Sequence, residues 1–212
     1  MRWIALLAFS GVLAMPLAAQ DKGLFPKEDL NKVPKGWTAA KTGDGEGSVW
    51  KVTADDTAPS KKGFVLAQTA ESPKAMFSLC VLDDSSLKDL QVSVAFKAVK
   101  GKVDQGGGIV WRYQDASNYY VARYNPLEEN FRLYKVVAGA RKQLATKDEF
   151  PLKGGEWHTL QIAMEGDKIE CKIDGKQIFE AKDSEFPKPG KVGLWTKADA
   201  QTYFDLFKVS GK

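Results

Sequence analysis

The chain has 212 residues, with 31 lysine and arginine side chains, 27 aspartate and glutamate side chains and a net charge of +4. These charges are interspersed, which argues against a surface for nucleic acid or for anionic membranes. The length suits one domain with a substantial hydrophobic core. The sequence leaves the oligomeric state open.

Residues 1–19 have the features of a cleaved secretory signal. Arg2 precedes an apolar run over 3–13, and small residues continue up to Ala18 and Ala19. The run is too short to span a bilayer, and no later stretch is apolar enough for a membrane span. We therefore expect an exported protein, periplasmic or extracellular, whose mature chain 20–212 is a single domain.

Residues 20–47 show little periodicity and are predicted to form a peripheral lead-in. Beyond them, short segments alternate between apolar and polar residues, separated by turn-forming stretches such as DASN and NPLEEN. No segment longer than ten residues has a helical apolar period. The succession predicts an all-β fold, a two-sheet sandwich or a barrel. The predicted strands are 48–53, 63–69, 76–81, 90–98, 107–114, 118–124, 130–137, 156–164, 169–174, 190–196 and 202–209.

Two cysteines, Cys80 and Cys171, fall in alternating apolar stretches and are expected on strands. In an exported protein they form either a disulfide or two buried free thiols. Their spacing is not a metal motif, and with a single histidine, His158, no zinc site is expected. Asp83 and Asp84 fit a capped turn better than a calcium site, so neither a metal nor another cofactor is indicated.

Residues 165–170 read EGDKIE and resemble the three-carboxylate catalytic strand of family 16 glycoside hydrolases. The residues between the carboxylates of such a strand should be apolar, but Gly166 and Lys168 are not. Apolar residues are even-numbered before the motif and odd-numbered after it, as a two-residue turn at Gly166-Asp167 would require. We therefore predict a hairpin instead of a catalytic strand. It would pair Met164 with Ile169, Ile162 with Cys171 and Leu160 with Ile173.

The segment around this hairpin resembles the C-terminal half of laminin-G-like and concanavalin A-like jelly-roll domains. The shared features are Trp157-His158, the Gly166-Asp167 and Asp174-Gly175 hairpins, GKVGLW at 190–195 and YFD at 203–205. The middle segment, GGGIVWRYQDASNYYVARYNPLEENFRLYKV, resembles the same superfamily, and especially secreted bacterial domains grouped with 3-keto-disaccharide hydrolases. The resemblance covers residues 36–209 and implies an antiparallel two-sheet jelly-roll sandwich. It does not fix a function, because lectins, glycosidases, lyases and adhesion modules share this fold.

Three strands of the middle segment are predicted to gather arginines and tyrosines on one sheet face. The DASN loop would pair Arg112 with Val121, and the NPLEEN loop would pair Arg123 with Arg132. The first face should be core and holds Ile109, Trp111, Tyr113, Tyr120, Ala122, Tyr124, Phe131 and Leu133. The second face holds the candidate ligand-binding residues Arg112, Tyr119, Arg123, Arg132 and Tyr134, together with Val110 and Val121.

The second face suits a sugar, because tyrosine rings offer flat apolar area and arginines donate to hydroxyls or carboxylates. The alternative is that these arginines only pair with surface acids such as Glu128 and Glu129. Other candidates fit a structural role better. His158 is expected at the rim of the core, and four further tryptophans are expected inside it: Trp37, Trp50, Trp157 and Trp195.

Three functions follow. The first is a secreted, lectin-like protein that binds a glycan on the Arg/Tyr face. The second, implied by the resemblance, is a glycoside-processing hydrolase, which needs a positioned acid and base. Its catalytic residues stay unassigned, because the nearby carboxylates fall on loops without an identifiable pair: Asp104, Asp115, Glu128 and Glu129. The third is a structural or adhesion module.

Overall fold

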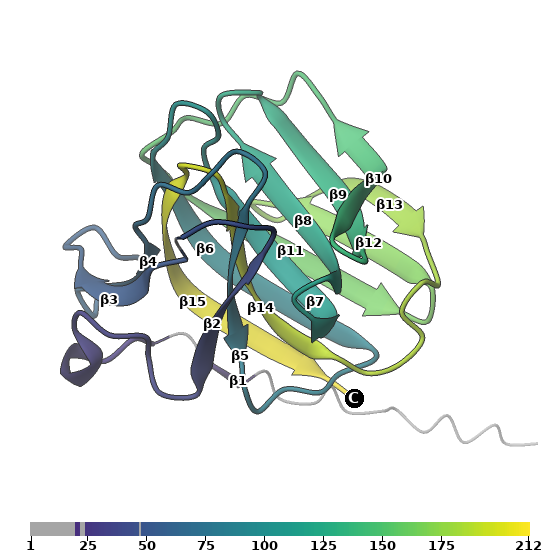
Figure 1. Cartoon of the computed structure of the whole chain (residues 1–212), viewed down its shortest axis with the longest axis horizontal. Coiled ribbons are helices and arrows are strands. Elements are labelled where there is room, and N and C mark those ends of the chain that lie inside the picture. Colours follow the sequence, from purple (N-terminus) through teal and green to yellow (C-terminus); the bar gives the residue numbers. More distant parts are fainter. Residues whose placement is uncertain (1–19, 22–23, 47) are drawn as a thin grey trace, which may run out of the picture.

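The computed structural model describes residues 20–21, 24–46 and 48–212. The predicted secretory signal lies outside these residues. The described chain consists of β-strands in two antiparallel sheets, with one short 3₁₀ helix, η1 (Lys27–Asp29) (Figure 1). None of its helices has the length and apolar character needed to cross a membrane. The predicted jelly-roll-like sandwich is confirmed.

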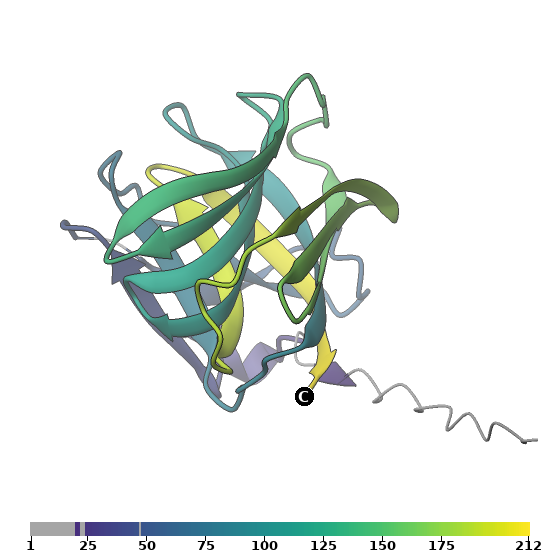
Figure 2. The same cartoon turned by 90° about the vertical axis from the view of Figure 1, so that its right-hand side faces the viewer.

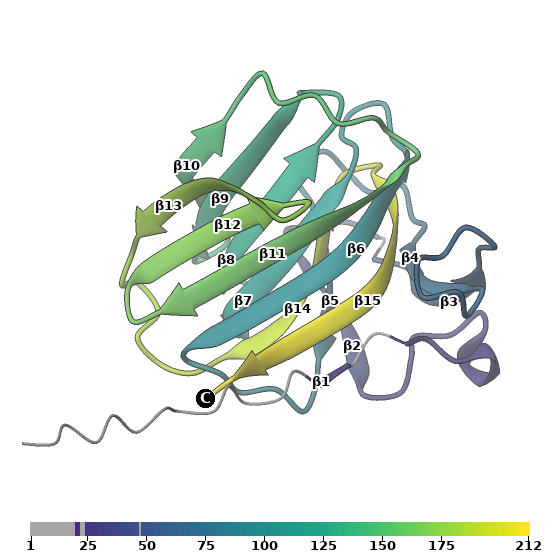
Figure 3. The same cartoon turned by 180° about the vertical axis from the view of Figure 1, so that it is seen from behind.

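The first sheet has eight strands in the order β13-β12-β11-β6-β15-β4-β3, with β1 paired to β15. It lies behind the second sheet in Figure 1 and faces the viewer in Figure 3. Its strands are β1 (Gln20–Asp21), β3 (Trp50–Ala54), β4 (Phe64–Gln68), β6 (Leu90–Lys100), β11 (Trp157–Glu165), β12 (Lys168–Ile173), β13 (Lys176–Lys182) and β15 (Gln201–Gly211).

The second sheet has seven strands in the order β10-β9-β8-β7-β14-β5-β2. Its non-sequential neighbours show that the chain crosses between the sheets several times, as in a jelly roll. Its strands are β2 (Trp37–Thr42), β5 (Phe77–Leu82), β7 (Gly107–Asp115), β8 (Asn118–Asn125), β9 (Asn130–Val137), β10 (Ala140–Lys147) and β14 (Lys191–Lys197).

The main hydrophobic core lies between the sheets and is built from one face of each strand. Trp111 and Tyr120 from the seven-stranded sheet stack with ring centroids 5.6 Å apart. They belong to the same buried cluster as Leu160 and Ile162 from the eight-stranded sheet. Trp37 and Trp50 also lie in this cluster, as predicted.

The EGDKIE segment forms the predicted hairpin between β11 and β12, with the expected register. Met164 pairs with Ile169, Ile162 with Cys171 and Leu160 with Ile173. Cys171 on β12 and Cys80 on β5 belong to different sheets, and both are buried free thiols. The disulfide alternative is therefore wrong.

Besides the two-residue β1, three strands are absent from the prediction: β2, β10 and β13. All lie at or beside a sheet edge, where both faces are partly exposed and apolar alternation is weak. The region predicted as a lead-in thus contains β2, an edge strand of the seven-stranded sheet.

Candidate functional site

The seven-stranded sheet is curved, so that strands near its two edges approach each other across its outer face. Arg141 on the edge strand β10 has its guanidinium carbon 5.3 Å from the ring centre of Phe77 on β5. Five strand spacings separate β10 from β5, which is about 24 Å in a flat sheet. One arginine side chain cannot span that distance, so the sheet must curve. Strands β7 to β9, drawn in teal, bend strongly in Figure 2. We call this outer side the concave face.

Two contacts at one end of the sheet agree with this curvature. The amide of Gly139, in the β9–β10 turn, donates to the carbonyl of Ser117, in the β7–β8 turn, at 2.9 Å. Thr42 on the opposite edge strand, β2, donates to the carbonyl of Ala116 at 2.5 Å. Both edges of the sheet therefore meet the same β7–β8 turn.

A second buried cluster, separate from the main core, covers the concave face. Its large members, which we call the aromatic floor, are Phe77, Tyr119, Tyr134 and Trp195. The hydroxyl of Tyr119 lies 2.7 Å from Oγ1 of Thr42, and burial raises the pKa of Tyr119, which keeps the phenol protonated. Half-buried Tyr113 stacks on Tyr119 with ring centroids 6.0 Å apart.

Arg141 lies across the aromatic floor. Its guanidinium carbon is 4.2 Å from the ring centre of Tyr134 and 6.0 Å from that of Trp195, which is cation–π geometry. Burial lowers the pKa of Arg141 from its usual value. The Nη1 atom is buried and has no hydrogen-bond partner among the residues that the structure describes.

A polar network occupies one end of the concave face. Arg123, only 2% exposed, donates from Nη2 to Glu128 Oε2 at 2.8 Å and to the Tyr134 hydroxyl at 3.5 Å, and from Nη1 to Asn130 Oδ1. Burial alone would raise the pKa of Glu128, but the hydrogen bond and charge of Arg123, with Asn130 and Arg132, hold it below its usual value. Glu128 is therefore ionised at neutral pH.

Asp104 and Lys197 form an ion pair beside this network. Nζ of Lys197 lies 2.7 Å from Oδ2 of Asp104, and Asn125 Nδ2 donates to Oδ1 of the same carboxylate at 2.9 Å. Asp104 is 2% exposed, so this pair is well shielded from solvent. The charges of Asp104 and Glu128 both act on Arg141.

Four of the five predicted ligand-binding residues lie on the concave face: Tyr119, Arg123, Arg132 and Tyr134. The β8–β9 register pairs Arg123 with Arg132, as predicted. Arg132 lies 3.4 Å from both Glu128 and Asp148, and Arg123 pairs with Glu128. These two arginines therefore have acidic partners, as the alternative interpretation expected, yet still belong to the face.

The predicted pairing of Arg112 with Val121 is wrong. Val121 pairs with Val110, and the two-residue turn between Asp115 and Asn118 leaves a bulge in β7. Arg112 lies in this bulge with φ 45°, a left-handed conformation that turns the strand. The predicted core residue Tyr113 consequently contacts the concave-face cluster instead of the main core.

Arg112 is buried away from the other four predicted residues and joins three loops. Its Nε donates to Lys88 O at 2.9 Å, Nη1 to Phe186 O at 2.9 Å and Nη2 to Gly166 O at 2.7 Å. Gly166 belongs to the EGDKIE turn, so the hairpin is held in place by this arginine. The geometry gives Arg112 a structural role.

Sequence reasoning missed four residues of the face: Phe77, Arg141, Trp195 and Lys197. Trp195 is buried as predicted, but on the concave face, because it alternates with the core residues Val192 and Leu194. Trp195 and Lys197 could therefore have been predicted on this face from the alternation of apolar residues along their strand. Arg141 could not, because its strand is polar on both sides.

The remaining candidates lie elsewhere or cap turns. Asp115 accepts a hydrogen bond from the Ser117 amide at 2.7 Å, and Asp83 accepts one from Thr38 Oγ1 at 2.7 Å. His158 on β11 pairs with Asp174 at 2.8 Å. Trp157 is half-buried and donates to Thr57 Oγ1 at 3.0 Å, so its predicted core position is wrong.

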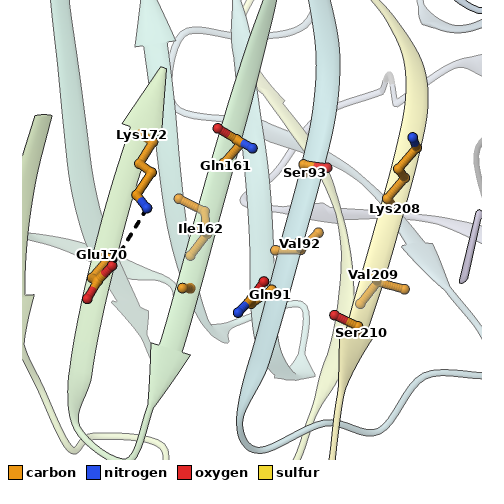
Figure 4. Close-up of a pocket in the computed structure, with 11 residues that line it drawn as sticks. Gln91, Val92, Ser93, Gln161, Ile162, Glu170, Lys172, Lys208, Val209 and Ser210 are labelled. Carbon is orange, nitrogen blue, oxygen red and sulfur yellow. Dashed lines mark ion pairs between the residues drawn. The ribbon is translucent and has the colours of Figure 1, made fainter. Parts of the chain in front are cut away.

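The eight-stranded sheet has an outer face of a different kind. A shallow hollow of about 190 Å³ runs over β12, β11, β6 and β15, lined by residues such as Gln161, Ser93 and Lys208 (Figure 4). Glu170 of EGDKIE lies in it, 2.8 Å from Lys168 and 4.0 Å from Lys172. Its carboxylate is thus neutralised by surface lysines.

Comparison with known proteins places the chain in a family. The sequence profile of the 3-keto-alpha-glucoside-1,2-lyase-like domain matches residues 22–210. The chain belongs to this family. No curated protein matches the sequence.

Solved structures with low identity share the fold of this family member. The carbohydrate-binding module CBM66 from Bacillus subtilis is 22% identical over 82% of this chain and 96% of its own, with a TM-score of 0.62. The family 16 glycoside hydrolase of a Bacteroides ovatus mixed-linkage glucan locus is 13% identical over 91% and 98%, with a TM-score of 0.56. At these identities the likeness shows the fold alone.

Proposed function

We propose that the protein binds a carbohydrate on the concave face of the seven-stranded sheet. The observation that carries this proposal is the aromatic floor of Phe77, Tyr119, Tyr134 and Trp195 with Arg141 across it. Aromatic rings pack against the C–H faces of sugars, and guanidinium groups donate to their hydroxyls. The rings of the floor are at most 7% exposed, so a sugar would reach this face through half-buried Tyr113, which stacks on Tyr119, and through half-buried Arg141.

Family membership and fold support the same conclusion. The family is named for an activity on a keto-glucoside, and the solved structures of similar fold include a carbohydrate-binding module and a glucan-bound glycoside hydrolase. The predicted secretory signal agrees with a protein that meets glycans outside the cytoplasm.

A glycan array followed by calorimetric titration tests the proposal. Tyr113→Ala removes a half-buried ring that stacks on Tyr119, and we expect it to weaken binding about tenfold, since aromatic contacts contribute about 1 kcal/mol or more. Gln161→Ala, on the outer face of the other sheet, is the matched control and should leave affinity unchanged. Equal effects of both variants, or no binding across the array, would contradict the proposal.

Glycoside cleavage is the second candidate, favoured by the family and by the ionised Glu128 at the end of the face. Elimination from a 3-keto-glucoside needs a base that takes the C2 proton next to the ketone while the C1–O bond breaks and the leaving oxygen gains a proton. We propose Glu128 for the first role, because it is an ionised carboxylate at the end of the face. Glu128→Gln should then abolish product release and retain binding; turnover by this variant would exclude Glu128 as the base.

A further inference from the structure

We infer that the sugar bound on the concave face carries an anionic group, a carboxylate or a sulfate or phosphate ester, which Arg141 and Arg123 recognise. This inference rests on the proposed function and specifies its ligand class. It is based on two guanidinium groups that lie near the same aromatic ring. Each has a nitrogen that forms no hydrogen bond with the described residues.

The two arginines flank Tyr134. The guanidinium carbon of Arg141 is 4.2 Å from the ring centre, and that of Arg123 is 5.9 Å from it. Each has one buried nitrogen without a hydrogen-bond partner, Nη1 of Arg141 and Nε of Arg123. Buried polar atoms are nearly always bonded, because an unbonded donor costs about 1–3 kcal/mol. Two such donors beside one ring indicate a place for an acceptor that comes from outside the chain.

The concave face carries more positive than negative charge, which also favours an anionic ligand. Lys197 has Asp104, and Arg123 and Arg132 share Glu128, with Asp148 also next to Arg132. Arg141 forms no ion pair with any carboxylate in the described part of the chain. The charge of Arg123 also disfavours the charged form of Arg141. One anion between them would neutralise the uncompensated cation and relieve this repulsion.

The chemistry of the guanidinium selects the anion type. Its planar fork donates two parallel hydrogen bonds to a pair of oxygens, which carboxylates, sulfates and phosphates present and a neutral sugar ring does not. Half-buried Tyr113, which stacks on Tyr119 of the aromatic floor, meanwhile offers area for a sugar ring. The combination fits an acidic sugar better than a free inorganic anion, which would use only the arginines.

The test is calorimetric titration with four probes: a galacturonic acid tetrasaccharide, the neutral galactose tetrasaccharide, a sulfated galactose tetrasaccharide and inorganic sulfate. We expect an acidic tetrasaccharide to bind at least tenfold more tightly than the neutral one and than inorganic sulfate. Its affinity should fall as salt concentration rises. The uronate and sulfate arms identify which anion is preferred.

Arg141→Gln should lower the affinity for the acidic tetrasaccharide on the order of 100-fold and change that for the neutral one about twofold or less. Arg141→Lys keeps the charge but loses the fork, so it should fall between wild type and Arg141→Gln. Lys142→Gln removes the same charge from the adjacent exposed residue and should have no effect. Melting temperatures show that each variant is folded.

The outcomes separate the two proposals. Equal affinity of neutral and acidic tetrasaccharides, with Arg141→Gln affecting both alike, overturns the anionic ligand and leaves sugar binding intact. Inorganic sulfate binding as tightly as the sulfated sugar also overturns it. Failure of all tetrasaccharides to bind the folded wild type overturns both.

Discussion

The two sheets have outer faces that differ in curvature and in chemistry. The outer face of the eight-stranded sheet carries exposed lysines and glutamates such as Lys168, Glu170 and Lys172, whose ion pairs are open to water. The concave face of the seven-stranded sheet carries buried aromatic rings with Arg141 across them. Both faces arise from the same alternation of residues along strands. Curvature decides which of them encloses its side chains.

Glycines on the concave face help the seven-stranded sheet to curve. A Cβ atom on Gly193 would lie 2.4 Å from Cys80 O, and one on Gly108 would lie 2.1 Å from Ala122 O. Only glycine permits such close approach of neighbouring backbones. Gly193 and Trp195 lie two positions apart on the same face of β14. Gly193 permits the close approach of β5, and Trp195 lines the concave face.

The largest effect is expected at Arg112, which was predicted to lie on the ligand-binding face but joins three loops in the structure. Arg112→Ala should lower the free energy of unfolding by about 3–5 kcal/mol, because one buried and two part-buried hydrogen bonds to carbonyls lose their charged donor. Urea unfolding measures this loss. Arg132→Ala removes a partly exposed partner of Glu128 and should cost less than about 1 kcal/mol. A stable Arg112→Ala variant with weakened sugar binding would return Arg112 to the ligand face.

Curvature itself is tested by Gly193→Ala. The added methyl group collides with the backbone of β5, so we expect the free energy of unfolding to fall by about 1–3 kcal/mol and sugar binding to weaken. Gly154→Ala is a useful control, because Gly154 is not in a left-handed conformation and a Cβ there meets no atom closer than 3.4 Å. If Gly193→Ala keeps full stability and binding, close strand approach is not what shapes the face.

A smaller effect is expected where the aromatic floor meets the opposite edge strand. Tyr119→Phe removes the hydrogen bond between the Tyr119 hydroxyl and Thr42, which should cost about 1 kcal/mol. Thr42 keeps its bond to the carbonyl of Ala116, so the loss is limited to one partner. Differential scanning calorimetry measures it, and an unchanged melting temperature would show that this contact does not hold the edge.

The polar end of the face should make stability depend on pH. The folded-state pKa of Glu128 is lowered, so its contribution is present above the unfolded-state value of about 4.3 and is lost as pH falls through the folded-state value. The stability difference between wild type and Glu128→Gln should therefore shrink in acid. Urea unfolding at several pH values between neutral and 3 measures it. A difference that grows on acidification would contradict the assigned sign.

The smallest effect belongs to the other outer face. Lys172→Ala removes an exposed partner of Glu170 at 4.0 Å, and we expect a stability change within about 0.5 kcal/mol and no change in sugar binding. Loss of binding in this variant would place the site in the hollow of the eight-stranded sheet instead of on the concave face.

The sequence predicted the fold well where strands are long and half-buried. The β11–β12 hairpin and the β8–β9 register followed from apolar parity and turn length. The alternation of apolar residues gave the wrong register at the bulge in β7. There Arg112 has φ 45° and shifts the strand pairing without any change in residue composition. The alternation also failed for β10, whose residues meet water on both sides, and so Arg141 was missed. Curvature is a property of the whole sheet, which local alternation does not encode.

The most direct test of a ligand site on the concave face is mapping of backbone and indole NMR shifts during titration with the galacturonic acid tetrasaccharide. We predict shifts at Arg141, Tyr134 and the indole of Trp195, with Gln161 and Lys172 unchanged. Shifts confined to Gln161, Lys172 and their neighbours on the eight-stranded sheet would contradict the account.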